Sequence, residues 1–104
     1  MNFQQILQTL PSIEGIQQIN IINSQGDIVH SIPAISGKLG SLLVYNALAQ
    51  QYQGKLDKNS AQQGIIWFAE HYQDALENPG KHPNIDLLLA VIANDEHWQI
   101  AVLR

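Results

Sequence analysis

The chain has 104 residues, of which 45% are hydrophobic and 13% charged, as expected for one globular domain. Nine acidic residues outnumber five scattered basic ones, so no face can neutralise a row of phosphates and nucleic-acid binding is not expected. Without cysteine the chain forms no disulfide, thiolate nucleophile or cysteine-ligated metal site. It shows neither a signal-peptide pattern nor an apolar stretch long enough to cross a membrane, which predicts a cytoplasmic protein without membrane contact.

The first third of the chain predicts a helix followed by a β-hairpin. Apolar residues from Phe3 to Leu10 recur at helical spacing, and Pro11 ends that helix. Two β-branched runs, Ile19–Ile22 and Ile28–Ile32, are separated by the turn sequence Ser-Gln-Gly-Asp. The loop that begins at Pro33 is a connector and does not continue the second strand.

The middle of the chain predicts two helices. The first, from Ser41 to about Gln53, is apolar on two sides, so we expect it between the sheet and another helix. The second begins at Ser60, which forms a capping-box pattern with Gln63. It ends at the Pro-Gly pair of residues 79–80.

The last part of the chain predicts a buried segment and a final strand. Periodicity alone allows residues 85–93 to be a buried helix or a buried strand. A helix is favoured, because Asn84 is a good N-cap, Asp86 suits the first turn, and leucine and alanine dominate. Residues 97–104 alternate and predict a strand. The resulting order is α-β-β-α-α-α-β in a single domain of residues 1–104, an α+β fold with a small, mostly antiparallel three-stranded sheet covered by helices.

The sequence SGKLGS, residues 36–41, is the first candidate site. Free amides at a helix start, together with Lys38, could hold an anion. The glycine spacing differs from the phosphate-loop pattern of nucleotide-binding proteins. The simpler interpretation is a flexible loop with Ser41 as the helix cap.

Polar side chains on the predicted third helix form a second candidate. Glu70, Asp74 and Glu77 share one face, which fits a basic partner, a hard cation or simply a solvated surface. His71 lies at the edge of the apolar stripe and is either a structural histidine or part of a groove. The histidines show no helical i, i+4 pair and no HExxH pattern, so no metal site is predicted.

The segment ENPGKHPNID, residues 77–86, looks most like a site. Each of its residues also fits a corner between two helices, with Gly80 at positive φ and Asn84 as the next N-cap. The helix end and its loop nevertheless bring an acid, two imidazoles and an amine close together. The candidate ligand-binding residues are Glu70, His71, Lys81 and His82, together with Lys38.

Two segments carry a resemblance to a known family: GSLLVYNALA, residues 40–49, and AEHYQDALENPGKHPNIDLL, residues 69–88. They resemble a family of small bacterial proteins of about this length that is classified as a domain of unknown function, numbered 2322. The resemblance extends from the first helix to about Ile92, and PGKHPNID is its most specific element. It implies a bacterial, cytosolic, free-standing domain, and it supplies no catalytic residue, cofactor or partner. The α-β-β-α beginning is also similar to roadblock-type dimerisation domains, although the two consecutive helices after it do not fit that plan.

Two functions remain open on these grounds. The first is a non-catalytic binding or interaction module, with a homodimer or another protein as partner, because no nucleophile–base pair is visible and charge is scarce. The second is a small enzyme or an anionic-ligand-binding protein that uses the Glu70/His71 and Lys81/His82 region. No cofactor is predicted.

Overall fold

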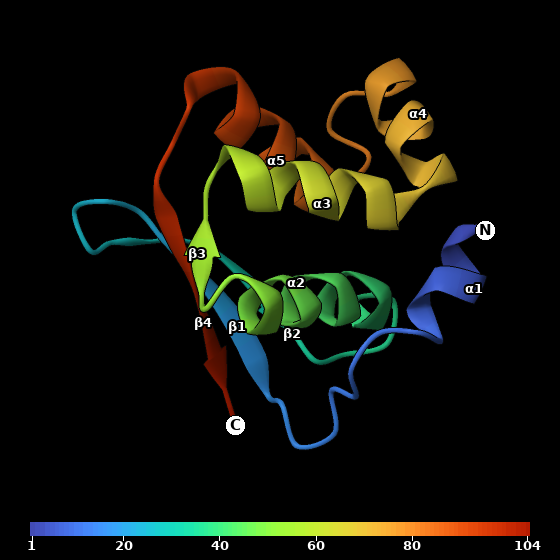
Figure 1. Cartoon of the computed structure of the whole chain (residues 1–104), viewed down its shortest axis with the longest axis horizontal. Helices are drawn as coiled ribbons and strands as arrows, with labels where there is room; N and C mark the ends of the chain where they lie inside the picture. Colours follow the sequence, from blue (N-terminus) through green and yellow to red (C-terminus); the bar gives the residue numbers. More distant parts are fainter.

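The computed structural model describes all 104 residues and contains five helices and a four-stranded antiparallel sheet (Figure 1). The elements are α1 (Phe3–Leu7), β1 (Gln18–Ile22), β2 (Ile28–Pro33), α2 (Leu39–Gln51), β3 (Lys55–Leu56), α3 (Lys58–Phe68), α4 (Glu70–Glu77), α5 (Pro83–Asn94) and β4 (Trp98–Leu103). The predicted α+β class is confirmed. Two details were not predicted: the short strand β3 and the division of the third helix into α3 and α4. None of the five helices has the length and apolar character that crossing a bilayer requires.

The sheet has the strand order β2-β1-β4-β3, with the first and last strands of the chain at its centre. Ile19 of β1 lies opposite Ile32 of β2 and Val102 of β4, and Ile21 lies opposite Ile100. Because side chains alternate along a strand, these residues share one apolar face, and the helices cover it (Figure 1).

The predicted three-stranded sheet is corrected to four strands by β3. This strand has two residues, Lys55 and Leu56, which pair with Gln99 and Trp98 of β4. Two residues are too few to show an alternating pattern in sequence. The strand therefore exists only through its pairing with a segment more than forty residues away.

Helix α2 lies where its two apolar sides predicted. It contacts all four strands, and α1 and α3 also pack against it. Leu42, Val44, Tyr45 and Leu48, which point in different directions around the helix, are all fully buried. Only a helix enclosed by other elements buries side chains on two sides in this way.

The predicted long third helix is divided at Ala69. Helix α3 ends at Phe68, and Ala69 has φ 52° and ψ −122°, a backbone conformation that non-glycine residues rarely adopt. Helix α4 then begins at Glu70. No glycine or proline marks this position, so the sequence carries no signal for the break.

The N-cap of α3 lies three residues earlier in the chain than predicted. The N-cap is Asp57, whose carboxylate accepts a hydrogen bond from the Ser60 N–H at 3.1 Å. Ser60 returns the bond, because its hydroxyl accepts from the Asp57 N–H at 2.9 Å. Ser60 therefore occupies the N3 position of a capping box and not the N-cap position.

Residues 83–94 form a helix, the alternative that the sequence favoured for residues 85–93, but Asn84 is not its N-cap. The cap position is His82, Pro83 is the first helical residue, and no side chain caps the helix. Asn84 is buried and has another role, because its Oδ1 lies 2.6 Å from Nε2 of His30 on β2. Its carbonyl accepts a hydrogen bond from the hydroxyl of Tyr45 on α2. Asn84 thus joins the start of α5 to the sheet and to α2.

Candidate functional site

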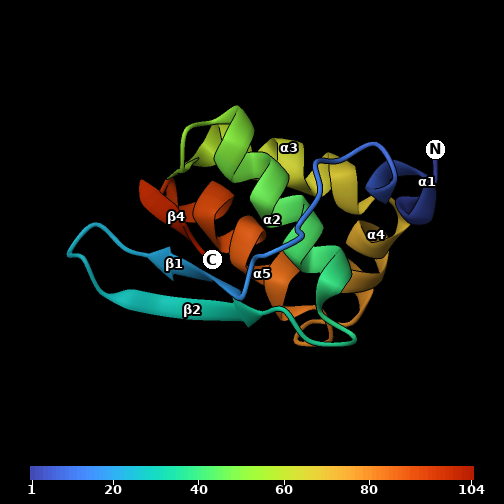
Figure 2. The ribbon, with the colours of Figure 1, turned by 90° about the horizontal axis from the view of Figure 1, so that it is seen from below.

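A cleft of about 510 Å³ opens where four segments of the chain meet. Its walls come from α1, the start of α2, the α3–α4 junction and the start of α5. Figure 2 shows α1, α4 and the start of α2 at the same end of the molecule. The apolar lining consists of Phe3, Leu7, Leu39, Leu43, Phe68 and Ile85.

Four of the five predicted ligand-binding residues line this cleft. They are Lys38, His71, Lys81 and His82, which come from three segments of the chain. The fifth, Glu70, does not line it. No aspartate or glutamate lines the cleft, although acidic residues outnumber basic ones in the chain. The cleft therefore differs in charge from the molecule as a whole.

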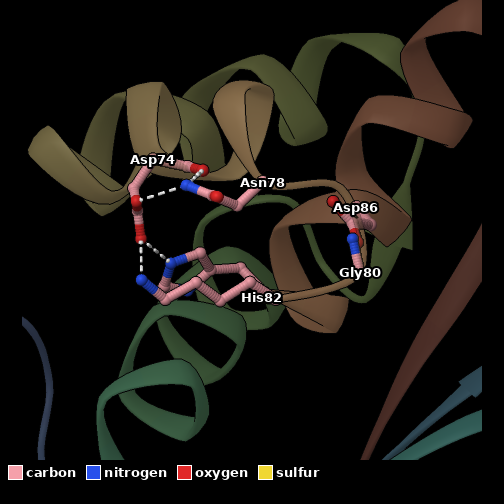
Figure 3. A network of polar contacts seen from close by, with 6 residues as sticks. Asp74, Asn78, Gly80, His82 and Asp86 are labelled. Atoms are coloured by element: carbon pink, nitrogen blue, oxygen red, sulfur yellow. Dashed lines mark hydrogen bonds and ion pairs between the residues drawn. The ribbon is translucent and has the colours of Figure 1, made fainter.

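Asp74 does not line the cleft but forms ion pairs with Lys81 and His82, which do. Figure 3 shows its contact with His82. Its Oδ2 lies 2.6 Å from Nε2 of His82 and 3.0 Å from Nζ of Lys81. The hydrogen bonds from His82 and then Lys81 lower the pKa of Asp74 from 3.8 to about 2. Asn78 also donates to the other carboxylate oxygen at 2.9 Å. Asp74 is thus the link between α4 and the following loop.

The corner between α4 and α5 is built much as the sequence suggested. Gly80 has φ 91°, which confirms its positive φ, and its N–H donates to Oδ2 of Asp86 at 3.0 Å (Figure 3). The Lys81 N–H donates to the carbonyl of Asn78 at 3.1 Å. These bonds close the loop on both sides of Gly80. The same corner presents two of the cleft's side chains, so one loop serves as both corner and cleft wall.

Ser41 was predicted to cap α2, and the structure shows that it does not. Helix α2 begins at Leu39, its N-cap is Lys38, and no side chain caps it. The first-turn N–H groups of Leu39, Gly40 and Ser41 therefore have no partner within the chain. All three residues line the cleft.

Sequence reasoning missed the part that α1 plays. The Phe3 ring stacks on Phe68 with centroids 5.6 Å apart and meets the His71 ring edge-on at 4.7 Å. A Cβ on Gly40 would lie 3.0 Å from the Phe3 ring, so α1 sits directly against the start of α2. The only signal in the sequence was the apolar spacing of α1, which indicates a buried face but not its partner.

Glu70 anchors α1 and does not enter the cleft. Its Oε1 accepts a hydrogen bond of 2.8 Å from the Phe3 N–H. Hydrogen bonds from its own backbone N–H and from that of Phe3 lower the pKa of Glu70. The predicted acidic face of Glu70, Asp74 and Glu77 is accordingly not one unit, since the first two carboxylates bind different parts of the chain.

The histidines are placed separately, apart from one pair. The rings of His71 and His82 lie 5.5 Å apart in the cleft, whereas His30 bonds to Asn84 and His97 is exposed. No group of three or more histidine, aspartate or glutamate side chains is arranged to hold a metal ion.

The chain was compared with models of known protein families. The model of the bacterial family described as "Uncharacterized protein conserved in bacteria (DUF2322)" matches residues 3–102. The chain belongs to this family. The match confirms the resemblance, and in this DUF2322 protein it covers every element that builds the cleft. Searches of curated proteins and of solved structures gave no match.

Proposed function

We propose that this DUF2322 protein is a non-catalytic module that binds a small anionic ligand in the cleft. The observation that carries the proposal is the lining itself, which contains Lys38, His71, Lys81 and His82 and no carboxylate. Lys38 forms no ion pair, so its charge is free to act on a ligand. The uncapped amides at the start of α2 add donors on the same wall. A site with these groups fits an anion of either the carboxylate or the phosphate type.

The proposal is tested by thermal unfolding with increasing inorganic phosphate, at an ionic strength held constant with sodium chloride. A ligand that binds only the folded state raises its stability, so the midpoint should rise with phosphate concentration. Lys38→Gln should reduce this rise at least threefold. Lys55→Gln removes an exposed lysine of β3, outside the cleft. This variant should show the same rise in midpoint with phosphate as the natural protein. Equal responses in both variants, or no response of the natural protein, would contradict the proposal.

We also propose self-association of the domain along β2, the interaction role that the sequence suggested. Strand β2 is at the edge of the sheet, and edge strands offer unpaired backbone groups to a second strand. Its sequence IVHSIP contains no lysine or acid, and Ile28 and Val29 are 59% and 44% exposed. A second copy could extend the sheet by antiparallel pairing.

Light scattering coupled to size-exclusion chromatography tests this second proposal. A dimer is expected at high protein concentration, and Val29→Lys should convert it to a monomer because a charge on an edge strand opposes pairing. Ile66→Lys changes an exposed apolar residue on α3, outside the sheet, and serves as the control. A monomer at every concentration tested would count against the β2 edge.

A further inference from the structure

We infer that the ligand of the cleft is an amphipathic anion, a small organic acid with a single negative charge and one compact apolar body. This inference rests on the proposed function and names the ligand class. It follows from three properties of the cleft: the arrangement of its apolar and charged residues, its volume and its charge balance.

The lining residues differ in exposure, and the two most buried of them are apolar. Phe68 and Ile85 are only 3% and 1% exposed and form the floor. Leu7 and Leu43 are half-buried and line the walls, and Leu39 at the rim is 44% exposed. Among the charged and imidazole groups, the Lys81 side chain is 60% exposed, and three others are half-buried, namely Lys38, His71 and His82. A ligand with an apolar end directed inward and an anionic end directed outward meets both surfaces.

The volume of the cleft agrees with a ligand larger than a bare ion. At about 510 Å³ it falls in the range of roughly 300–1,000 Å³ that small-molecule sites occupy. Phosphate or acetate alone would leave the leucine surface in contact with water. An added ring or branched chain would bury that surface, and burial of apolar area is favourable at about 25 cal/mol per Å².

The charge balance favours one negative charge over several. Lys38 and Lys81 contribute two positive charges, and Asp74 behind Lys81 contributes one negative charge, which leaves one positive charge before the imidazoles are counted. His82 shares the same carboxylate as Lys81. A di- or triphosphate would carry more charge than these groups neutralise. A monocarboxylate or a singly charged ester matches them.

Four probes separate this inference from the proposed function. They are acetate, inorganic phosphate, 2-naphthoate and the neutral 2-naphthamide, titrated by amide-resolved NMR at constant ionic strength. We expect 2-naphthoate to bind at least about tenfold tighter than acetate or phosphate, and tighter than the amide. Leu39→Ala should weaken 2-naphthoate about threefold and leave phosphate unchanged. Ile66→Ala is the control, because Ile66 is an exposed apolar residue of α3 outside the cleft. It should change neither the affinity for 2-naphthoate nor that for phosphate.

The other outcomes have distinct meanings. Equal affinity for acetate, phosphate and 2-naphthoate would overturn the amphipathic ligand and leave the anion site standing. Equal affinity for 2-naphthoate and its amide would overturn both, because charge would then contribute nothing. Absence of binding by all four probes at millimolar concentration would overturn the proposed function and this inference with it.

Discussion

The carboxylate of Glu70 accepts a hydrogen bond of 2.8 Å from the backbone N–H of Phe3, across 67 residues of sequence. This bond joins the first residue of α1 to the first residue of α4. It places the Phe3 ring against Phe68 and His71, on the two sides of the Ala69 break. One wall of the cleft therefore depends on a contact between the chain's beginning and its middle.

Removal of this carboxylate should loosen α1. In Glu70→Ala the Phe3 N–H loses its partner, so we expect the amides of residues 3–7 to exchange with solvent at least about threefold faster, with little change in the central strands. Hydrogen exchange followed by NMR measures this. Glu77→Ala on the same helix is the control, because the side chain of Glu77 hydrogen-bonds only to Gln73. Unchanged exchange in α1 would show that ring packing alone holds it.

Replacement of Ala69 by glycine should stabilise the folded protein. Its φ of 52° with ψ of −122° is a region that glycine enters freely and other residues enter at a cost of about 1–2 kcal/mol. Ala69→Gly should therefore raise the free energy of unfolding by about 1 kcal/mol, after the greater entropy of glycine in the unfolded chain is subtracted. Urea unfolding measures the change. Ala93→Gly, an exposed position within α5, should instead destabilise by about 0.5–1 kcal/mol. Destabilisation by Ala69→Gly would contradict the strain.

Asp74 should make stability depend on acid pH. Its folded pKa of about 2 is below its value of 3.8 without partners, so its stabilising effect is complete above about pH 4 and is lost as pH falls to about 2. Asp74→Asn should remove part of the stability and flatten its pH dependence in that range. Urea unfolding at several pH values tests this, with Glu14→Gln as an exposed control. Parallel pH profiles for Asp74→Asn and the natural protein would refute the assignment.

Tyr45 should contribute to stability through its hydroxyl. The side chain is fully buried, burial raises its pKa, and its hydroxyl donates to the carbonyl of Asn84. Tyr45→Phe keeps the ring and removes the donor, so we expect a loss of about 0.5–1.5 kcal/mol in the free energy of unfolding. Tyr72→Phe changes a half-buried tyrosine of α4 and should be close to neutral. Equal effects of the two substitutions would exclude a specific role for the Tyr45 bond.

Gly80 should resist substitution for conformational and not steric reasons. Its φ is 91°, and a Cβ at this position would meet no atom within 4 Å. Gly80→Ala should therefore destabilise by about 1 kcal/mol through backbone strain alone. Gly80→Asn should cost less, since asparagine tolerates positive φ better than alanine. Thermal or urea unfolding compares the two, and an alanine variant as stable as the natural protein would disprove the strain.

The sequence by itself determined the class and most of the elements. The hairpin, the enclosed helix α2 and the positive φ of Gly80 all follow from local patterns. For residues 85–93 the local pattern favoured a helix and left a strand open. Hydrophobic spacing reports which face of an element is buried, and turn residues report backbone conformation, so both are readable without knowledge of the partner. It also selected Lys38, His71, Lys81 and His82, which the structure brings to one cleft.

Tertiary structure decided the features that depend on distant partners. Strand β3 exists through pairing with β4, and the break at Ala69 carries no local signal. Asparagine is a residue type that often caps helices. The side chain of Asn84 nevertheless bonds to His30, because β2 lies beside the start of α5. Glu70 likewise bonds to the start of α1 and does not line the cleft. A polar side chain can satisfy its hydrogen bonds locally or at a distance, and only the packing of the elements determines which partner it finds.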